Sequence, residues 1–113
     1  MSETLALRVK GMTCDSCARH VEEALAKDLQ FRTSYERVPK WFTAVQAAEP
    51  VYGFKTLVEE KTGRILGAHL VGPHADEVIN LFAFVIRKGL TAEDLKSAIF
   101  AYPTGASDIS YMV

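Results

Sequence analysis

Two cysteines, Cys14 and Cys17, are the residues of this chain whose type and spacing best suit chemistry. They are the only cysteines among 113 residues and stand three positions apart. Thiolate sulfur is polarisable, so a close pair favours Hg(II) or Cu(I) over hard cations that prefer oxygen. Two sulfurs suffice for an ion in linear coordination, whereas a structural zinc site normally has four ligands. The spacing therefore predicts a soft-metal site with Cys14 and Cys17 as its ligands, and it disfavours zinc.

The neighbouring residues predict a strand before the cysteines and a helix after them. Leu5, Leu7 and Val9 recur at every second position, which is typical of a half-buried strand. Apolar residues then recur at helical spacing between 16 and 27. Cys17 would lie in the first helical turn, where free amides and the positive end of the helix dipole stabilise a thiolate.

Two other interpretations of the cysteine pair stay open. The pair could form a redox dithiol of the thioredoxin kind, although such a motif usually ends a strand within a larger βαβ frame that this sequence does not supply. It could also be an inherited motif without a function. His20 follows Cys17 by three positions, and we interpret it as a surface histidine rather than a third ligand.

Composition excludes several classes of function. The chain is 49% hydrophobic, which suits one compact domain with a real core, and its formal net charge is −1. Because no basic run is present, nucleic acid is not expected as a partner. Because no apolar stretch reaches about 18 residues and the start is polar, we expect neither a membrane span nor a signal peptide. The expected location is the cytoplasm, where free thiols persist.

The remainder of the chain predicts an antiparallel sheet and two helices. Strands are expected at 30–36, 41–46, 52–59 and 65–71, with Gly63 in the left-handed position of the turn between the last two. A helix is expected at 76–88, ended by Gly89. A short helix should follow, with Thr91 as its N-cap, Asp94 completing the capping box, and the buried residues Leu95, Ala98 and Ile99.

The predicted helix at 76–88 is apolar on more than one face. Leu81 and Phe84 widen its apolar stripe, so a second face should contact another helix or another subunit. Packing and capping are the expected roles of His69 and His74. The aromatic residues expected to serve the core and an interface are Phe31, Tyr35, Trp41, Phe42, Phe82 and Phe84.

The first part of the chain carries a recognisable signature. The letters Gly-Met-Thr-Cys occupy 11–14 and a further Cys occupies 17. With the flanking strand and helix, residues 5–27 resemble the opening of heavy-metal-associated domains, whose signature is Gly-Met-Thr-Cys-x-x-Cys. The resemblance implies that Cys14 and Cys17 bind the ion, while Met12 and Thr13 shape the loop.

A second set of motifs runs through the rest of the chain: Gly53-Phe54-Lys55, Thr62-Gly63-Arg64-Ile65-Leu66-Gly67-Ala68-His69, Val71-Gly72-Pro73-His74-Ala75, Glu77-Val78-Ile79, Gly89-Leu90-Thr91-Ala92-Glu93-Asp94-Leu95 and Tyr102-Pro103-Thr104. On these motifs, residues 23–113 resemble the C-terminal dimerisation domain of FAD-dependent pyridine nucleotide-disulfide oxidoreductases. That group includes glutathione reductase, dihydrolipoamide dehydrogenase and mercuric reductase. The resemblance implies an α+β fold, with an antiparallel sheet flanked by helices, and a two-fold homodimer.

The resemblance also implies what this chain lacks. The flavoenzymes bind FAD and NAD(P)H through Gly-x-Gly-x-x-Gly loops, and this sequence contains none. Tyr102 stands at the position of the family's catalytic histidine, and Asp108 approximates the position of its paired glutamate. Since phenols titrate well above neutral pH, a tyrosine is a poor proton shuttle there. We therefore expect neither catalysis nor FAD or NAD(P) binding by this chain alone.

The two resemblances together predict a partial heavy-metal-associated motif at 1–27 and a reductase-type dimerisation domain at 23–113. Mercuric reductases can carry both, so the chain resembles the two ends of such an enzyme without its nucleotide-binding middle. The predicted function is a homodimeric module that binds Hg(II) or Cu(I). One alternative is the dimerisation part of an oxidoreductase that works with a separate flavin-binding chain. Another is a structural protein that only dimerises.

Overall fold

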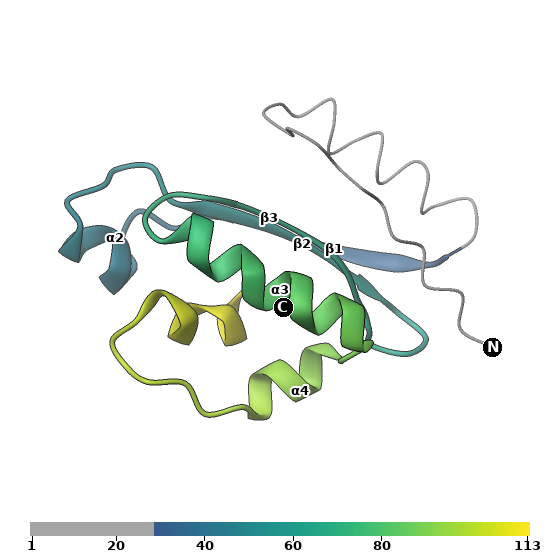
Figure 1. Cartoon of the computed structure of the whole chain (residues 1–113). Helices are drawn as coiled ribbons and strands as arrows, with labels where there is room; N and C mark the ends of the chain where they lie inside the picture. Colours follow the sequence, from purple (N-terminus) through teal and green to yellow (C-terminus); the bar gives the residue numbers. More distant parts are fainter. Residues whose placement is uncertain (1–28) are drawn as a thin grey trace. The chain divides into compact units, whose positions relative to one another are not determined.

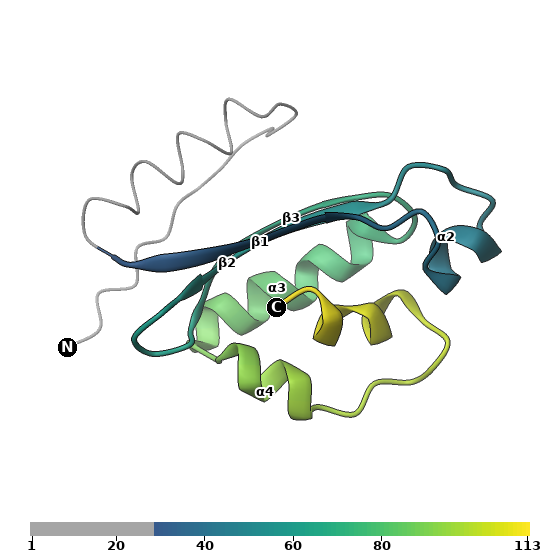
Figure 2. The same ribbon diagram turned by 180° about the vertical axis from the view of Figure 1, so that it is seen from behind.

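A computed structural model describes residues 29–113 of the chain. In this part the elements follow in the order β1, α2, β2, β3, α3, α4 and the 3₁₀ helix η1. The strands form one antiparallel sheet, and α3, α4 and η1 lie on one of its faces (Figures 1 and 2). The predicted α+β fold class is thereby confirmed. The strand, cysteine loop and helix predicted before residue 28 lie outside the described residues.

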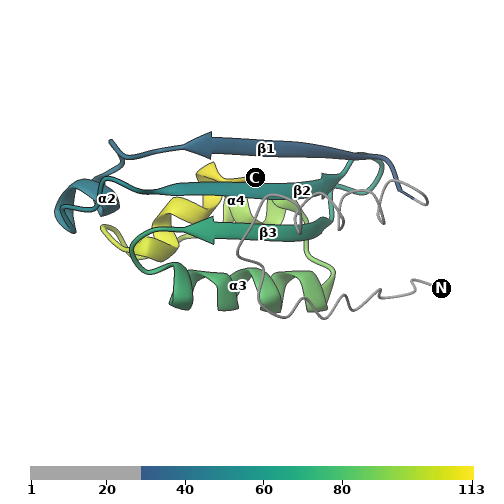
Figure 3. The ribbon, with the colours of Figure 1, turned by 90° about the horizontal axis from the view of Figure 1, so that it is seen from above.

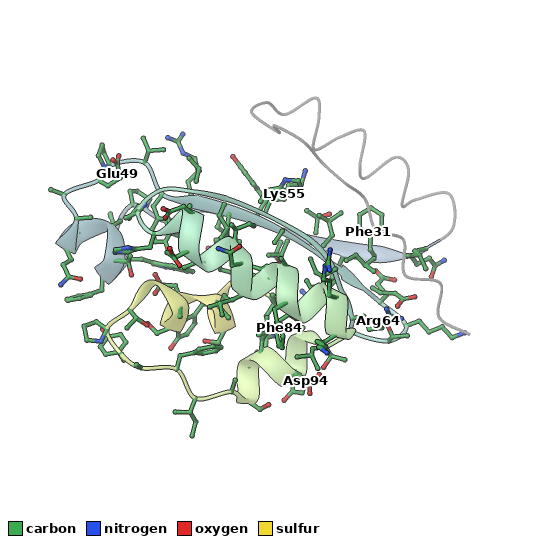
Figure 4. All side chains as sticks on the ribbon, viewed as in Figure 1. Phe31, Glu49, Lys55, Arg64, Phe84 and Asp94 are labelled. Atoms are coloured by element: carbon green, nitrogen blue, oxygen red, sulfur yellow. The ribbon has the colours of Figure 1, made fainter. Side chains whose placement is uncertain are left out.

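The sheet has the strand order β1-β2-β3 (Figure 3). Strand β1 (Phe31–Arg37) pairs with β2 (Gly53–Glu59), and β2 pairs with β3 (Ile65–Val71). These bounds confirm the strands predicted at 30–36, 52–59 and 65–71. Tyr35, Lys55 and His69 are aligned across the three strands, and Lys55 rises from the sheet face opposite to the helices (Figure 4).

A tight turn joins β2 to β3. The N–H of Gly63 donates to the carbonyl of Glu59 at 2.8 Å, and the N–H of Glu59 donates to the carbonyl of Arg64 at 2.8 Å. Gly63 has φ of 74°, a left-handed conformation in which a side chain would be strained. The predicted hairpin and the predicted role of Gly63 are therefore confirmed.

Helix α3 (Ala75–Lys88) packs one apolar stripe against the sheet. Val78, Phe82 and Val85 are buried and belong to the same core as residues of β2 and β3. The helix ends at Gly89, which has φ of 66° and donates its N–H to the carbonyl of Ile86 at 3.1 Å. The predicted helix at 76–88 and its stop are confirmed.

Helix α4 (Ala92–Ser97) begins with the predicted capping box. The N–H of Asp94 donates to the Thr91 hydroxyl at 3.1 Å, while the N–H of Thr91 donates to the Asp94 carboxylate at 2.8 Å. Leu95 is buried as predicted. The prediction that Ala98 and Ile99 are buried is wrong, because the helix ends at Ser97, the backbone of Ala98 is extended, and Ile99 is 100% exposed.

The strand predicted at 41–46 is also wrong. The chain forms the short helix α2 (Phe42–Gln46), in which the adjacent residues Thr43 and Ala44 are both buried. A strand would send such neighbours to opposite faces. Trp41, at the N-cap, has its ring centroid 5.8 Å from Tyr52 and 5.6 Å from Phe54, so tertiary aromatic contacts decide the local structure.

The end of the chain completes the core. Helix η1 (Gly105–Tyr111) buries Ile109, and Met112 and Val113 are buried after it. The hydroxyl of Thr56 in β2 donates a 2.5 Å hydrogen bond to the carbonyl of Met112. Within residues 29–113, no helix combines the length and the apolar character needed to cross a membrane.

Candidate functional site

The predicted metal ligands, Cys14 and Cys17, lie outside the described residues, as do Met12, Thr13 and His20. Within residues 29–113, no group of three or more histidine, cysteine, aspartate or glutamate side chains is placed to hold a metal ion. The described part therefore offers a different set of candidate features. These are the C-terminal segment around Tyr102 and Asp108, a groove beside α3, and the exposed face of α3.

Asp108 belongs to η1, and its side chain is buried, with 8% of the residue exposed. Its Oδ2 accepts hydrogen bonds from the hydroxyl of Thr43 at 2.6 Å and from the hydroxyl of Tyr52 at 2.8 Å. Thr43 belongs to α2 and Tyr52 precedes β2, so one carboxylate joins three segments. Burial, followed by the hydrogen bond and the charge of Asp108, raises the pKa of Tyr52 far above its usual value. Tyr52 therefore acts as a donor to a carboxylate acceptor.

Tyr102 lies elsewhere. Its side chain is 74% exposed, and its ring centroid is 6.0 Å from that of Phe42, which is also exposed. Along the sequence, a capping box separates Tyr102 from Asp108, and in it the N–H of Ser107 donates to the Thr104 hydroxyl at 3.2 Å. Tyr102 and Asp108, which stand at or near the positions of the family's catalytic pair, thus do not contact the same partners. Tyr102 contacts an exposed aromatic ring, whereas Asp108 accepts hydrogen bonds from two buried hydroxyls. The hydrogen bonds of Asp108 therefore attach the C-terminal segment to the core, and the exposed rings of Tyr102 and Phe42 form an aromatic surface where that segment begins.

A groove of about 500 Å³ runs between the first half of α3 and residues 103–106, which lead into η1. Its walls combine apolar and polar side chains, with Leu81 and Pro103 among the former and Glu77 and Asn80 among the latter. Gly105 also lines the groove, and a Cβ added there would lie 3.0 Å from Cβ of His74 and 3.1 Å from Cγ2 of Val78. The close approach of the two segments therefore depends on a glycine.

His74 and His69 have the structural positions that were predicted for them. His74 is the N-cap residue of α3, with φ of 62°, but its side chain makes no capping hydrogen bond and instead lines the groove. His69 lies half-buried in β3. The prediction of a capping side chain at His74 is thus wrong, because its imidazole forms no hydrogen bond with the first amides of the helix.

The exposed face of α3 combines apolar and charged side chains. Phe84 is 59% exposed and Leu81 is 37% exposed. Phe84 is labelled on α3 in Figure 4. Asp76 and Glu77 occupy the first turn of this helix, and Arg87 and Lys88 occupy the last turn. Each pair suits the helix dipole at its own end. The helix therefore presents an apolar centre between an acidic and a basic end.

The whole described fold falls within one known family. Residues 20–113 match the family described as pyridine nucleotide-disulphide oxidoreductase, dimerisation domain. This chain belongs to that family. The predicted resemblance of the second region is thus confirmed.

Relatives of this dimerisation domain differ greatly in length. An uncharacterised 19.7 kDa protein in a mercuric resistance operon of Staphylococcus aureus is 42% identical over 92 residues, which are 81% of this chain and 51% of that protein. Glutathione reductase from a Nostoc species is 30% identical over 82 residues, 73% of this chain and 17% of the enzyme. The chain therefore spans about half of the first relative and a small part of the enzyme.

Solved structures carry the same domain. The HOCl-induced flavoprotein disulfide reductase RclA from Escherichia coli superimposes with a TM-score of 0.74 at 25% identity, covering 80% of this chain and 21% of that chain. Its Cu(II) complex gives a TM-score of 0.73 with the same coverage. LpdA from Mycobacterium tuberculosis has the same fold at 21% identity, with a TM-score of 0.72.

Sequence reasoning missed the hydroxyl partners of Asp108. Tyr52 is 56 positions away and Thr43 is 65 positions away, so no local spacing connects them. The prediction of a strand at 41–46 also gave no reason to expect a buried Thr43, because a strand would not place both Thr43 and Ala44 in the interior. The one available signal was that Asp108 is the only charged residue between Lys96 and the end of the sequence.

Proposed function

We propose that this chain is a homodimeric module that binds one soft metal ion, Hg(II) or Cu(I), through Cys14 and Cys17. Residues 20–113 join two copies and have no hydride chemistry of their own. The observation that carries the proposal is the combination of a Cys-x-x-Cys pair with a dimerisation domain 42% identical to a protein of a mercuric resistance operon. A reducing compartment such as the cytoplasm keeps the two thiols free for the ion.

Ligand chemistry supports the metal part of the proposal. Hg(II) and Cu(I) prefer soft thiolates, and two such ligands satisfy linear coordination. The Gly-Met-Thr-Cys-x-x-Cys letters at 11–17 resemble the signature of heavy-metal-associated domains. Metal binding requires deprotonated sulfur, so the affinity should fall as the pH falls below the thiol pKa values.

The exposed face of α3 supports the dimer part. The core already uses Val78, Phe82 and Val85 on the opposite face of this helix. Leu81 and Phe84 therefore leave apolar area in water that a second copy would cover. In a family named for dimerisation, we assign this face to contact between copies.

A titration of the reduced chain tests the metal part. Wild-type protein should bind one Hg(II) or Cu(I) per chain, and the Cys14→Ala/Cys17→Ala variant should bind none at the same concentrations. Equal binding by the variant would contradict the proposed site. Sedimentation tests the dimer part of the proposal. A wild-type chain that stays monomeric at micromolar concentration would contradict the proposed homodimer.

A second candidate function is the dimerisation part of an oxidoreductase that acts with a separate flavin-binding chain. The exposed ring pair of Phe42 and Tyr102 favours it, since two adjacent exposed aromatic side chains suit contact with another protein. Retention of FAD, visible as a yellow colour, by a complex purified through this chain would support that function. A colourless complex without a flavoprotein would count against it.

A further inference from the structure

We infer that the β1 strands of two copies pair antiparallel about Ser34, which joins two three-stranded sheets edge to edge. This contact uses a different surface from the α3 face assigned above, so the two contacts can be tested separately. The inference commits the outer edge of β1 to one occupant, the β1 strand of a second copy of this chain.

Strand β1 forms an edge of the sheet (Figure 3). In the part of the chain that the structure describes, β1 pairs with β2 alone. The same register continues to Val38, whose N–H donates to the carbonyl of Tyr52 at 2.7 Å. Since backbone groups alternate in direction along an antiparallel strand, the even-numbered residues of β1 bond to β2. The N–H and C=O groups of the odd-numbered residues from 31 to 37 therefore point to the outer edge.

Two-fold pairing about Ser34 suits this alternation. It places Thr33 of each copy opposite Tyr35 of the other, and both residues direct their backbone groups to the outer edge. In an antiparallel ladder, the two residues of such a pair exchange both backbone hydrogen bonds. Phe31 and Arg37 form the next hydrogen-bonded pair in each direction. The axis generates every contact twice, as in any isologous interface.

Arg32 and Glu36 supply charge complementarity in this register. Both are exposed, and because four positions separate them they lie on the same face of β1. Within one chain Ser34 stands between them, and the Arg32 guanidinium donates to the Ser34 hydroxyl at 3.3 Å. Pairing about Ser34 brings Arg32 of each copy directly opposite Glu36 of the other. These are non-hydrogen-bonded pairs, in which cross-strand side chains lie closest and opposite charges stabilise the contact.

The same two charges select one register. Charged side chains on an edge strand normally prevent its association with other strands. A two-fold axis at Thr33 would place Arg32 opposite Ser34, and an axis at Tyr35 would place Arg32 opposite Val38. Either shift leaves both charges without an opposite partner across the contact. The charged residues therefore favour association in the register about Ser34 and oppose it in the neighbouring ones.

Tyr35 adds apolar area to the contact. Its side chain is 66% exposed. In the register about Ser34 it stands opposite Thr33, and aromatic side chains pair favourably with β-branched ones across strands. A contact between single strands of seven residues is smaller than a standard interface. We therefore expect a Kd on the order of 0.1 to 1 mM, so that dimers formed at micromolar concentration associate further only when concentrated.

Charge variants of the full chain test the register. Sedimentation from about 10 μM to about 1 mM should show wild-type dimers assembling into larger species. Arg32→Glu and Glu36→Arg should each weaken this step about tenfold or more at low salt, because each places like charges opposite each other twice. The Arg32→Glu/Glu36→Arg variant keeps the wild-type net charge and restores the opposite pairs. It should associate as wild type does, and so should a mixture of the two single variants.

A proline variant tests the backbone part of the contact. Thr33→Pro removes an N–H that faces the outer edge rather than β2, so it should abolish the further association while the fold persists. Thr33→Ala is the matched control, because it keeps that N–H and should still associate. Circular dichroism verifies that each variant folds.

The outcomes separate this inference from the proposed homodimer. Wild-type dimers that do not associate further at about 1 mM, and that Arg32→Glu leaves intact, would overturn the β1 pairing alone. Association that the single charge variants do not weaken would also overturn it, including the case in which another segment of this chain occupies the edge. Loss of the dimer itself in Arg32→Glu, with its return in the doubly substituted variant, would support the β1 pairing and contradict the assignment of α3. A monomer at every concentration would overturn both.

Discussion

The hydroxyl of Tyr52 donates a 2.8 Å hydrogen bond to Oδ2 of Asp108, across 56 positions of the sequence. The same oxygen accepts a 2.6 Å hydrogen bond from Thr43, so one buried carboxylate links η1 to α2 and to the segment just before β2. Because hydrogen bonds to a charged group are stronger than neutral ones, this contact is well placed to hold the C-terminal segment on the sheet. The aspartate that resembles a catalytic position therefore has a structural role here.

Loss of the Asp108 carboxylate should destabilise the fold. Asp108→Ala leaves two buried hydroxyls without their acceptor, and we expect it to lower the free energy of unfolding by about 2 to 4 kcal/mol. Urea denaturation measures the change. Glu60→Ala, at the exposed hairpin turn, is the control and should change the free energy of unfolding by less than about 0.5 kcal/mol. Equal stability of the two variants would show that the carboxylate does not hold these segments together.

Two glycines with positive φ should respond differently to alanine. At Gly72, φ is 128° and an added Cβ would lie 2.7 Å from the Tyr52 ring and 2.9 Å from the Val51 carbonyl oxygen. At Gly63, φ is 74° and the nearest atom would be 3.7 Å away. Gly63→Ala should therefore cost about 1 to 2 kcal/mol of unfolding free energy from backbone strain alone, and Gly72→Ala should cost more. Thermal melting of both variants checks the order, and the reverse order would contradict it.

The capping box of α4 should weaken in acid. The backbone N–H of Thr91, followed by its hydroxyl, holds the pKa of Asp94 below its usual value. A carboxyl whose pKa is lower in the folded than in the unfolded state stabilises the fold above the unfolded pKa, and this contribution is lost as the pH falls through the folded pKa. NMR titration should show the low pKa in wild type. The Asp94→Asn variant should have a lower free energy of unfolding than wild type at neutral pH, and the difference between the two proteins should shrink in acid. A difference that stays constant with pH would contradict the assignment.

Local sequence patterns predicted the elements whose signals lie within a few residues. The hairpin at Gly63, the Thr91 and Asp94 capping box and the stop at Gly89 each depend on backbone requirements that particular residues meet. The alternation in 30–36 likewise marked β1. These predictions succeeded because the deciding contacts are close in sequence.

The wrong predictions concern segments whose local structure is decided by contacts between residues far apart in the sequence. The aromatic residues Trp41 and Phe42 favoured a strand by propensity, but Trp41 packs on Tyr52, Phe54 and Tyr111, and a short helix forms. Ile99 was assigned to a helical stripe that ends two residues earlier, at Ser97. The partners of Asp108 come from α2 and from the residue just before β2, and only the tertiary fold brings them together. The cysteine site lies outside the described residues and stays a prediction.

Native mass spectrometry of the reduced chain, incubated with one equivalent of Hg(II), tests the proposed function most directly because it reads the assembly and its metal content together. We predict a dimer that carries two mercury ions, and a dimer without mercury for the Cys14→Ala/Cys17→Ala variant. A metal-free wild-type dimer, a wild-type monomer, or equal mercury on both proteins would contradict the proposal.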